Sequence, residues 1–160
     1  MRGIFNEKLR GFVESDSYLG RIICSGDIAA DPDTIAEKFE FALKWKEQLT
    51  SDKFKLNFFK VLSDGTLENG SAACPNPYPQ TGAKVSPAFT EDQEYEYMVK
   101  SYKHGLDYNI HAIGPDAVHR VLMAAKRVRE EGIKDLRICM SHCTCVYKDD
   151  ARNGKHKSLP

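Results

Sequence analysis

The stretch LDYNIHAIGPDAVHRVLMAAKRVREEGIKDLRICMSHCTCV, Leu106 to Val146, decides the fold. Its pattern predicts a strand, a helix and a second strand, and a histidine ends each strand: His111 after LDYNI and His142 after LRICMS. The two histidines are 31 positions apart. That spacing is close to one strand-plus-helix repeat of a (β/α)8 barrel, in which about 250 residues serve eight repeats. We therefore expect both imidazoles at one rim, at the carboxyl ends of neighbouring parallel strands, where they could bind a divalent metal.

Two further runs extend this alternation towards the amino end. Residues 21–28 form a short β-branched run typical of a buried parallel strand, and residues 54–62 predict a second strand. Between them, Asp31 and Pro32 predict a helix start, with Asp31 as the N-cap and Pro32 in the first helical position. The chain therefore predicts an α/β fold in which parallel strands alternate with helices.

Two more helices have recognisable ends. Thr90 and Gln93 form a capping-box pattern, which predicts a helix that begins at residue 90. Pro115 predicts the start of the next helix and Gly132 predicts its end. The chain has room for about half of an eight-stranded barrel.

The lysine of the second strand has two interpretations. Strict alternation places Phe54, Leu56, Phe58, Lys60 and Leu62 on one face. A lysine near a strand end can extend its amine to solvent past apolar neighbours. Alternatively, burial lowers the pKa of the Lys60 amine and leaves it neutral and nucleophilic, able to take up carbon dioxide as a carbamate that bridges two metals.

Four pieces of the chain resemble one protein family. HAIGPDAVHRVLMAAKRV followed by DLRICMSHCTCV is similar to the amidohydrolase 3 family, the metal-dependent hydrolases of the N-substituted formamide deformylase type. In that family strand 5 ends in His-Ala-Ile-Gly-Asp and strand 6 in another histidine. FKVLSDGTLENGSA and PNPYPQTG resemble the family's strand 4, with its Lys and Asp-Gly, and the loop after it. The resemblance covers roughly residues 53–150 and implies that residues 1–160 form one partial barrel domain, about strands 3 to 6.

The resemblance also implies which residues form the site. The metal ligands would be His111, His142 and Lys60, the lysine as a carbamate. The residues that contact substrate would be Asp64, Tyr78 and Asp116. The cofactor would be a divalent metal, zinc in the first place, and the substrate a small molecule with an amide or formamide-like C–N bond.

Several features of the family are missing here. The usual Asp after His-Ala-Ile-Gly is Pro115, and the carboxylate follows one place later as Asp116. No two of the five histidines are two positions apart, so the strand-1 His-x-His is absent, and the strand-8 Asp lies beyond the part that matches. No catalytic residue can therefore be assigned in this chain. Two histidines alone should hold zinc weakly, because a catalytic zinc usually has three protein ligands.

Two function hypotheses follow. The first is a metal-dependent hydrolase of C–N bonds other than peptide bonds, present as a fragment that is not active alone. The second is a catalytically impaired half-barrel that serves as a structural or oligomerising module. A parallel half-sheet exposes two edges, which predicts self-association or pairing with the remainder of a longer parent chain.

Three segments flank or interrupt the predicted repeats. We expect a lead-in helix over residues 1–19, a long loop on the active-site side over residues 64–89, and a flexible tail over residues 150–160. Trp45 lies off the apolar stripe of its helix, which predicts a partly buried packing residue.

Composition excludes several classes of partner. Basic and acidic residues balance at 23 each, without a basic stripe, which argues against a nucleic-acid module. The apolar runs are far shorter than a membrane span. Five cysteines in no disulfide-framework spacing favour a reducing compartment, and hence the cytoplasm. We expect Cys139, Cys143 and Cys145 to be buried packing residues, because adjacent strand residues point in opposite directions and cannot share one zinc ion.

Overall fold

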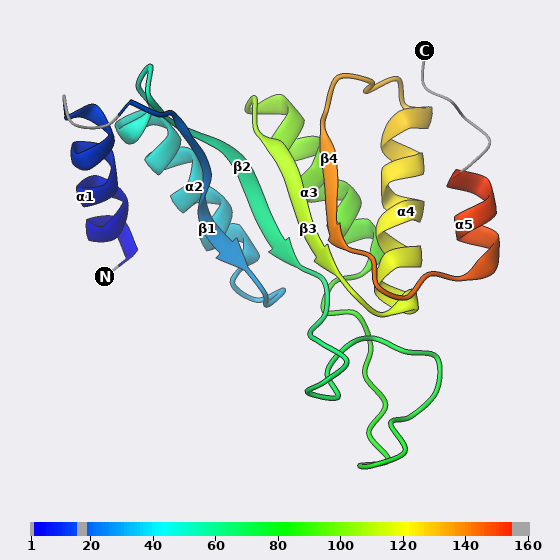
Figure 1. The fold of residues 1–160 in the computed structure, drawn as a ribbon. Helices are drawn as coiled ribbons and strands as arrows, with labels where there is room; N and C mark the ends of the chain where they lie inside the picture. Colours follow the sequence, from blue (N-terminus) through cyan, green and yellow to red (C-terminus); the bar gives the residue numbers. More distant parts are fainter. Residues whose placement is uncertain (1, 16–18, 155–160) are drawn as a thin grey trace.

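The computed structural model describes residues 2–15 and 19–154, in which four strands alternate with helices (Figure 1). In chain order the elements are α1 Arg2–Glu14, β1 Ile22–Ala29, α2 Ile35–Leu49, β2 Phe54–Leu62, α3 Glu91–Lys103, β3 Asp107–Ala112, α4 Pro115–Glu130, β4 Ile138–His142 and α5 Lys148–Gly154. The predicted lead-in helix is α1. Residues 16–18 of that predicted segment, and residues 155–160 of the predicted tail, lie outside the described residues.

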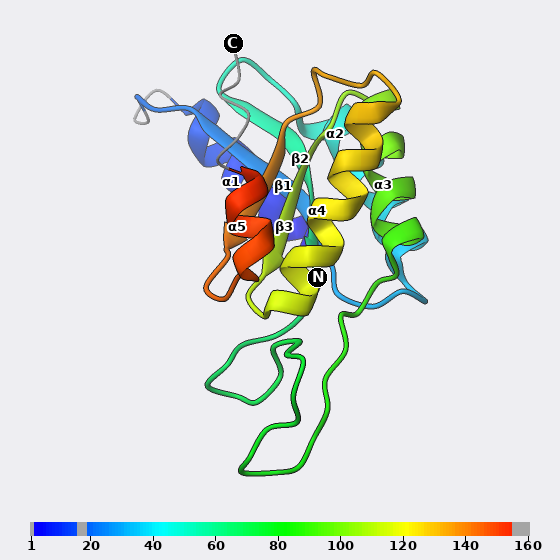
Figure 2. The same ribbon diagram turned by 90° about the vertical axis from the view of Figure 1, so that its right-hand side faces the viewer.

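The sheet has the strand order β1-β2-β3-β4, and each neighbouring pair is parallel. Helices α2, α3 and α4 all lie on one face of it (Figures 1 and 2). A doubly wound sheet carries helices on both faces, whereas consecutive parallel strands with every crossover on one face are the arrangement of a barrel wall. The predicted partial (β/α)8 barrel is confirmed.

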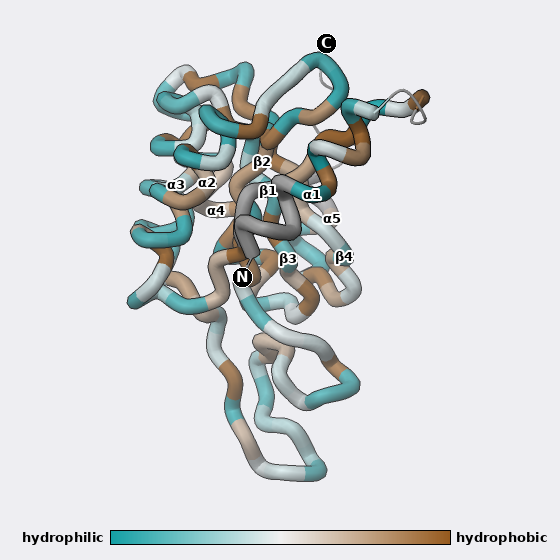
Figure 3. The backbone as a smooth tube through the Cα atoms, turned by 90° about the vertical axis from the view of Figure 1, so that its left-hand side faces the viewer, coloured by the Kyte–Doolittle hydropathy of each residue, from teal (hydrophilic) through white to brown (hydrophobic). Residues whose placement is uncertain are grey.

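The main core lies between the sheet and these three helices. Its strand residues include Phe59, Val61, Tyr108 and Ile110, all fully buried. Phe39 of α2 packs edge-on against Phe59, with ring centroids 4.9 Å apart. The strands carry the hydrophobic stretches, while many outer turns of α2 and α3 are hydrophilic (Figure 3).

A smaller cluster packs at the amino end of the sheet. Val13 of α1 and Leu49 of α2 bury Phe54 and Leu56 of β2 there. Trp45 packs against this cluster as a partly buried side chain, which confirms its predicted role. The cluster holds α1 against the first two strands.

The predicted alternation of β2 is wrong beyond Leu56. Cys24 of β1 pairs with Leu56, but the next residue, Ser25, pairs with Phe58, so Asn57 is an extra residue in β2. Such a bulge reverses the faces of all later residues. The buried positions accordingly change from Phe54 and Leu56 to Phe59 and Val61. Lys60 therefore faces away from the helix-covered core, which explains a lysine in this strand.

The predicted helix starts agree with the structure in two cases out of three. Thr90 and Gln93 form the capping box of α3, and Pro115 occupies the first turn of α4. Helix α2 instead begins at Ile35 after the N-cap Thr34. Asp31 does not cap it, because its carboxylate accepts from the Asp33 N–H in a local turn.

The sequence did not predict the last helix of the described residues. Helix α5 covers Lys148–Gly154, and Asp150 is buried there. His119 of α4 places its Nδ1 3.0 Å from both carboxylate oxygens of Asp150. Residues 150–154 of the predicted tail are therefore helical. No helix in the described part of the chain is both long and apolar enough to cross a bilayer.

Candidate functional site

The two predicted metal-binding histidines meet at the carboxyl ends of β3 and β4. His111 projects from β3 on the face opposite the core, and its side chain is 13% exposed. His142 is the last residue of β4, where alternation alone would align it with Met140, which packs against the core. Positive φ angles at His142 and Cys143, 80° and 46°, turn the backbone there. The rings of His111 and His142 lie edge to face, with centroids 4.6 Å apart and planes at 67°.

The His111 ring is oriented by the loop after β2. Its Nε2 lies 2.9 Å from the Gly65 carbonyl oxygen. A carbonyl oxygen can only accept, so Nε2 carries the proton of the neutral ring and Nδ1 keeps the lone pair. A ligand histidine commonly has this second hydrogen bond, which fixes its tautomer and ring orientation. His111 is therefore prepared to bind a cation through Nδ1.

The side chain of Asp64, which was predicted to contact substrate, is fully buried and has hydrogen-bond partners within the protein. Its carboxylate accepts from the backbone N–H groups of Ala73, Ile113 and Gly114 at 2.9, 3.0 and 2.8 Å. One of its oxygens also lies 3.7 Å from His111 Nε2. The geometry thus gives Asp64 a structural role, because it joins the loop after β2 to the turn after β3 and so supports His111.

Asp116, which was also predicted to contact substrate, is surrounded by protein side chains in the structure. One carboxylate oxygen accepts from the Tyr147 hydroxyl, and the other lies 3.7 Å from the Lys84 amine. The hydrogen bond to Asp116 raises the pKa of Tyr147 to about 12. Lys84 in turn donates to the Cys74 carbonyl at 2.8 Å. Asp116 therefore links three segments: the long loop, the start of α4 and the segment that follows His142.

Tyr78, the third predicted substrate contact, points back into its own loop. Its hydroxyl donates to the Ala72 carbonyl at 2.9 Å, and the Cys74 sulfur lies 3.8 Å away. The loop over residues 63–90 extends beyond the carboxyl ends of the strands, the side that carries the two histidines (Figure 1). In this conformation Tyr78 supports the shape of that loop.

Lys60 lies on the same face of the sheet as His111, but farther from the carboxyl ends of the strands. It pairs in register with Asn109, and Leu62 pairs with His111. Its amine donates to Asn109 Oδ1 at 2.5 Å, and Ser141 donates to the same oxygen at 3.2 Å. Burial lowers the pKa of the Lys60 amine. The amine is thus held within the sheet face and does not extend to solvent past the strand end.

The cysteines do not form a metal site with His142. All five are free; Cys143 and Cys145 are half-buried, whereas Cys139 is exposed. The prediction that Cys139 is buried is therefore wrong, because the bulk of the core lies on the other face of β4. Across residues 2–15 and 19–154, no three His, Cys, Asp or Glu side chains gather closely enough to hold a metal ion. The donors present, two facing imidazoles, fit part of a divalent-metal site but not a complete one.

Sequence reasoning missed the partners that fix these side chains. Gly65 acts through its carbonyl oxygen, which no side-chain pattern reports. Lys84 and Tyr147 meet at Asp116 from distant parts of the chain. Asn109 could have been predicted as a partner of this site, because strand alternation places its side chain on the same face as His111.

Comparison with known proteins decides the family. Residues 10–157 match the family model described as Amidohydrolase family. The chain belongs to the amidohydrolase family. The narrower resemblance to formamide deformylases remains a prediction.

Three individual proteins are similar to parts or most of this amidohydrolase chain. The exoenzymes regulatory protein AepA of Pectobacterium carotovorum subsp. carotovorum is 32% identical over 79 residues, 49% of this chain and 17% of that protein. An uncharacterized metal-dependent hydrolase from Pyrococcus furiosus superposes on 78% of this chain and 25% of its own, with 24% identity and a TM-score of 0.51. Another from Pyrococcus horikoshii OT3 superposes on 94% of this chain and 28% of its own, with 18% identity and a TM-score of 0.58. The chain thus spans about a quarter of each structure, and the two likenesses support the barrel fold.

Proposed function

We propose that this chain forms the central wall of a metal-dependent hydrolase that cleaves a C–N bond in a small amide or formamide-like substrate. His111 and His142 would hold a divalent metal, zinc in the first place. Bound zinc would supply a water of lowered pKa and polarise the substrate carbonyl. The observation that carries the proposal is the contact of the two imidazoles, 4.6 Å apart, at the carboxyl rim of a barrel wall.

The residues around the histidines act by orientation. The Gly65 carbonyl accepts the Nε2 proton of His111, which leaves the Nδ1 lone pair to bind a metal. Asp64 holds Ala73 and Gly114 together and thereby fixes the loop that carries Gly65. Asp116, through Tyr147, fixes the segment that follows His142. In this proposal Asp64, Tyr78 and Asp116 shape the rim, and direct substrate contact requires the loop to change conformation.

Lys60 would contribute as a carbamate. Its burial-lowered pKa increases the share of neutral amine. The nitrogen lone pair of that amine attacks the carbon of carbon dioxide, one C=O electron pair moves to oxygen, and the nitrogen then loses a proton. The carbamate has two oxygen donors where the amine had one nitrogen. The hydrogen bond to Asn109 would have to open for this group to reach the rim.

The alternative function is an impaired half-barrel that serves as a structural module. Its support is the incomplete donor set: the described residues offer two imidazoles and no third close ligand. Under either function the chain alone is expected to turn over substrate poorly. The free cysteines fit a reducing compartment, so we propose a cytoplasmic location.

Metal content decides between the two functions. The purified chain would be incubated with zinc, passed through a desalting column and analysed for metal. We expect zinc to be retained by the wild type and lost in the double variant His111→Ala, His142→Ala. The matched control is His104→Ala, His119→Ala, which removes two histidines elsewhere and should keep the zinc. Equal zinc in both double variants would refute the site.

A second measurement addresses Lys60. The chain would be equilibrated with ¹³C-labelled bicarbonate and examined by ¹³C NMR for a carbamate signal. The signal should disappear in Lys60→Met and persist in Lys55→Met, because Lys55 is an exposed lysine of the same strand. A signal that survives in Lys60→Met would assign the carbamate to another amine.

A further inference from the structure

Glu94 is a buried acid that the proposed reaction does not use. It lies in the first turn of α3, and its side chain is closed off from solvent. Its Oε2 accepts from the Tyr108 hydroxyl at 2.9 Å. Its Oε1 and the Ser63 hydroxyl have no hydrogen-bond partner within the described residues. A buried polar group in this state lowers stability, so its presence in the core calls for a role other than packing.

Three other elements present polar groups to the Glu94 carboxyl. Tyr108 comes from β3, Ser63 follows β2, and Arg120 comes from α4. Burial first, and then the neighbouring Glu94 and Tyr97, raise the pKa of Tyr108 well above 10, so Tyr108 stays a neutral donor. Among the described groups that act on this carboxyl, Arg120 is the one cation.

The same neighbours hold both ends of the long loop between β2 and α3. Ser63 begins this loop, and its carbonyl oxygen accepts from the Ala88 N–H at 2.7 Å. Near the other end of the loop, the Phe89 carbonyl accepts from Arg120 Nη1 at 2.6 Å. The Phe89 ring is buried in the main core. The two ends of the loop therefore meet beside this acid.

We propose that Glu94 is a proton-operated latch for the carboxyl end of this loop. While the carboxyl group is neutral, Arg120 stays on the Phe89 carbonyl and the loop end is held. When the proton leaves to solvent, the buried carboxylate attracts Arg120, because a guanidinium binds a carboxylate more strongly than a neutral carbonyl. The Phe89 carbonyl then loses its donor. The ring of Phe89 keeps its place in the core, so the change is a loosening of the backbone at Ala88.

The direction of the switch follows from the surroundings of the acid. Burial raises the pKa of Glu94, so the loop end is held at low pH and loosens as pH rises above the ordinary range of a carboxyl group. The latch does not depend on the proposed hydrolysis. It is connected to the candidate site all the same, since the Ser63 N–H donates to the His111 carbonyl at 2.9 Å.

Hydrogen–deuterium exchange at the Ala88 amide, from pH 5 to pH 9, tests the latch. Each rate is divided by the rate of the unfolded chain at the same pH, and the slowest amides of β2 and β3 report global unfolding. In the wild type we expect protection at Ala88 to fall on the order of tenfold relative to those amides as pH rises. Glu94→Gln cannot ionise and should show no such fall.

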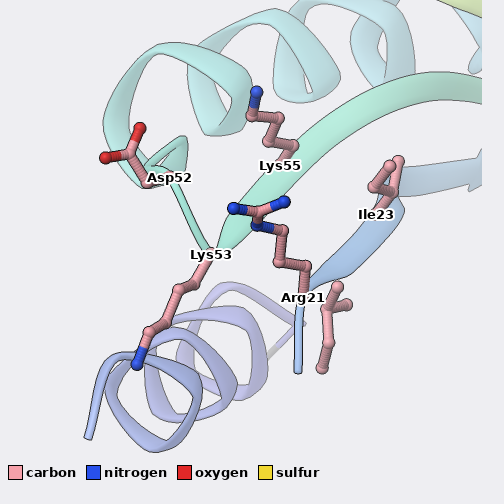
Figure 4. A pocket seen from close by; sticks show the side chains of 6 residues that line it. Arg21, Ile23, Asp52, Lys53 and Lys55 are labelled. Atoms are coloured by element: carbon pink, nitrogen blue, oxygen red, sulfur yellow. The ribbon is translucent and has the colours of Figure 1, made fainter. Parts of the chain in front are cut away.

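Arg120→Met should leave Ala88 weakly protected at every pH, because the Phe89 carbonyl then has no donor. The matched control is Arg21→Met. Arg21 is an exposed arginine beside the cavity at the amino ends of β1 and β2 (Figure 4), and its loss should leave the pH dependence intact.

Three results would overturn the inference. The first is protection at Ala88 that does not change with pH in the wild type, or that follows the amides of β2 and β3. The second is an equal fall in Glu94→Gln, which would assign the titration to another group. The third is a fall that survives in Arg120→Met, which would show that the carboxylate acts without Arg120.

Discussion

Asp64 and Gly114, fifty positions apart, are joined by a 2.8 Å hydrogen bond from the Gly114 N–H to the Asp64 carboxylate. The bond connects the loop after β2 with the turn between β3 and α4. The same carboxylate takes two more backbone N–H groups, from Ala73 and Ile113. His111 therefore gets its position from a junction of three backbone segments, and the first two predictions address that junction.

Asp64→Ala should lower the free energy of unfolding by about 3 kcal/mol or more, because three backbone N–H groups lose a charged acceptor in a buried place. Asp64→Asn should lower the free energy of unfolding by less, since the asparagine amide keeps one acceptor oxygen. Urea denaturation measures both. Asp31→Ala is the control, an exposed Asp that accepts one local N–H, with an expected loss of about 1 kcal/mol or less. A loss at Asp64→Ala no larger than at Asp31→Ala would contradict the structural role of Asp64.

Gly114→Ala should be strongly destabilising because the loop backbone passes against this residue. A Cβ at Gly114 would lie 2.2 Å from the Ala73 carbonyl oxygen, a backbone atom that cannot move aside alone. We expect a loss of about 2–4 kcal/mol. Gly11→Ala is the matched control: its Cβ would meet nothing within 4 Å, and alanine in helix α1 should gain up to about 1 kcal/mol. Thermal unfolding of both variants shows whether Gly114→Ala lowers the stability while Gly11→Ala raises it.

Glu94→Gln should stabilise the protein at neutral and alkaline pH. Glu94 is fully buried and its Oε2 accepts from the Tyr108 hydroxyl at 2.9 Å, while Oε1 has no hydrogen-bond partner in the described part of the chain. Burial raises the pKa of Glu94 above its usual 4.5, against the opposing effects of Tyr108, Ser63 and Arg120. A raised folded-state pKa means that its stabilising contribution is complete below pH 4.5 and is lost as pH rises further.

The measurement for Glu94 is the free energy of unfolding from pH 4 to pH 8. Glutamine keeps an acceptor for Tyr108 and has no proton to lose, so the variant should be more stable than the wild type at pH 8. Near pH 4 the two proteins should be similar. A pH dependence equal in both proteins would show that Glu94 does not control it.

Tyr147→Phe should loosen the segment that follows His142. The variant loses the hydroxyl that donates to Asp116, and a single hydrogen bond contributes about 0.5–1.5 kcal/mol. Because the bond raises the pKa of Tyr147 to about 12, its contribution is complete below pH 10 and is lost as pH rises through about 12. Ultraviolet titration should therefore lose a tyrosinate component near pH 12 in this variant.

The control for Tyr147 is Tyr102→Phe, on the exposed surface of α3. It should change the free energy of unfolding by less than about 0.5 kcal/mol and leave the component near pH 12 in place. Equal effects of the two substitutions would argue against the link through Asp116.

The sequence predicted helix starts correctly where the deciding residues lie at the helix end itself. The capping box of Thr90 and Gln93, and Pro115 at the start of α4, were predicted because each acts on its own helix end. The start of α2 was not, since Asp31 accepts from the Asp33 N–H in the turn that directly precedes the helix. Sequence alone does not tell which of two local hydrogen bonds such a side chain makes.

For the candidate site, the sequence predicted which two histidines come together, whereas the metal-binding and substrate-binding roles of its residues remain predictions. That His111 and His142 meet at one rim follows from the repeat length of a barrel, and the ring contact agrees with it. Asp64 and Asp116 have hydrogen-bond partners in the structure that the sequence did not predict, because a loop carboxylate gives the same sequence signal whether it binds substrate or protein groups. Only the fold showed that Ala73, Ile113 and Gly114 surround Asp64.

The sequence by itself determined the class of the fold, the order of its elements and the pair of histidines at the rim. These depend on apolar periodicity and on the direction of parallel strands, which act over one repeat of chain. The tertiary structure alone decided the bulge at Asn57 that turns Lys60 away from the core, and the left-handed backbone that brings His142 to His111. Both arise where one strand adjusts to its neighbour, and pairing between distant segments leaves no mark in the local pattern.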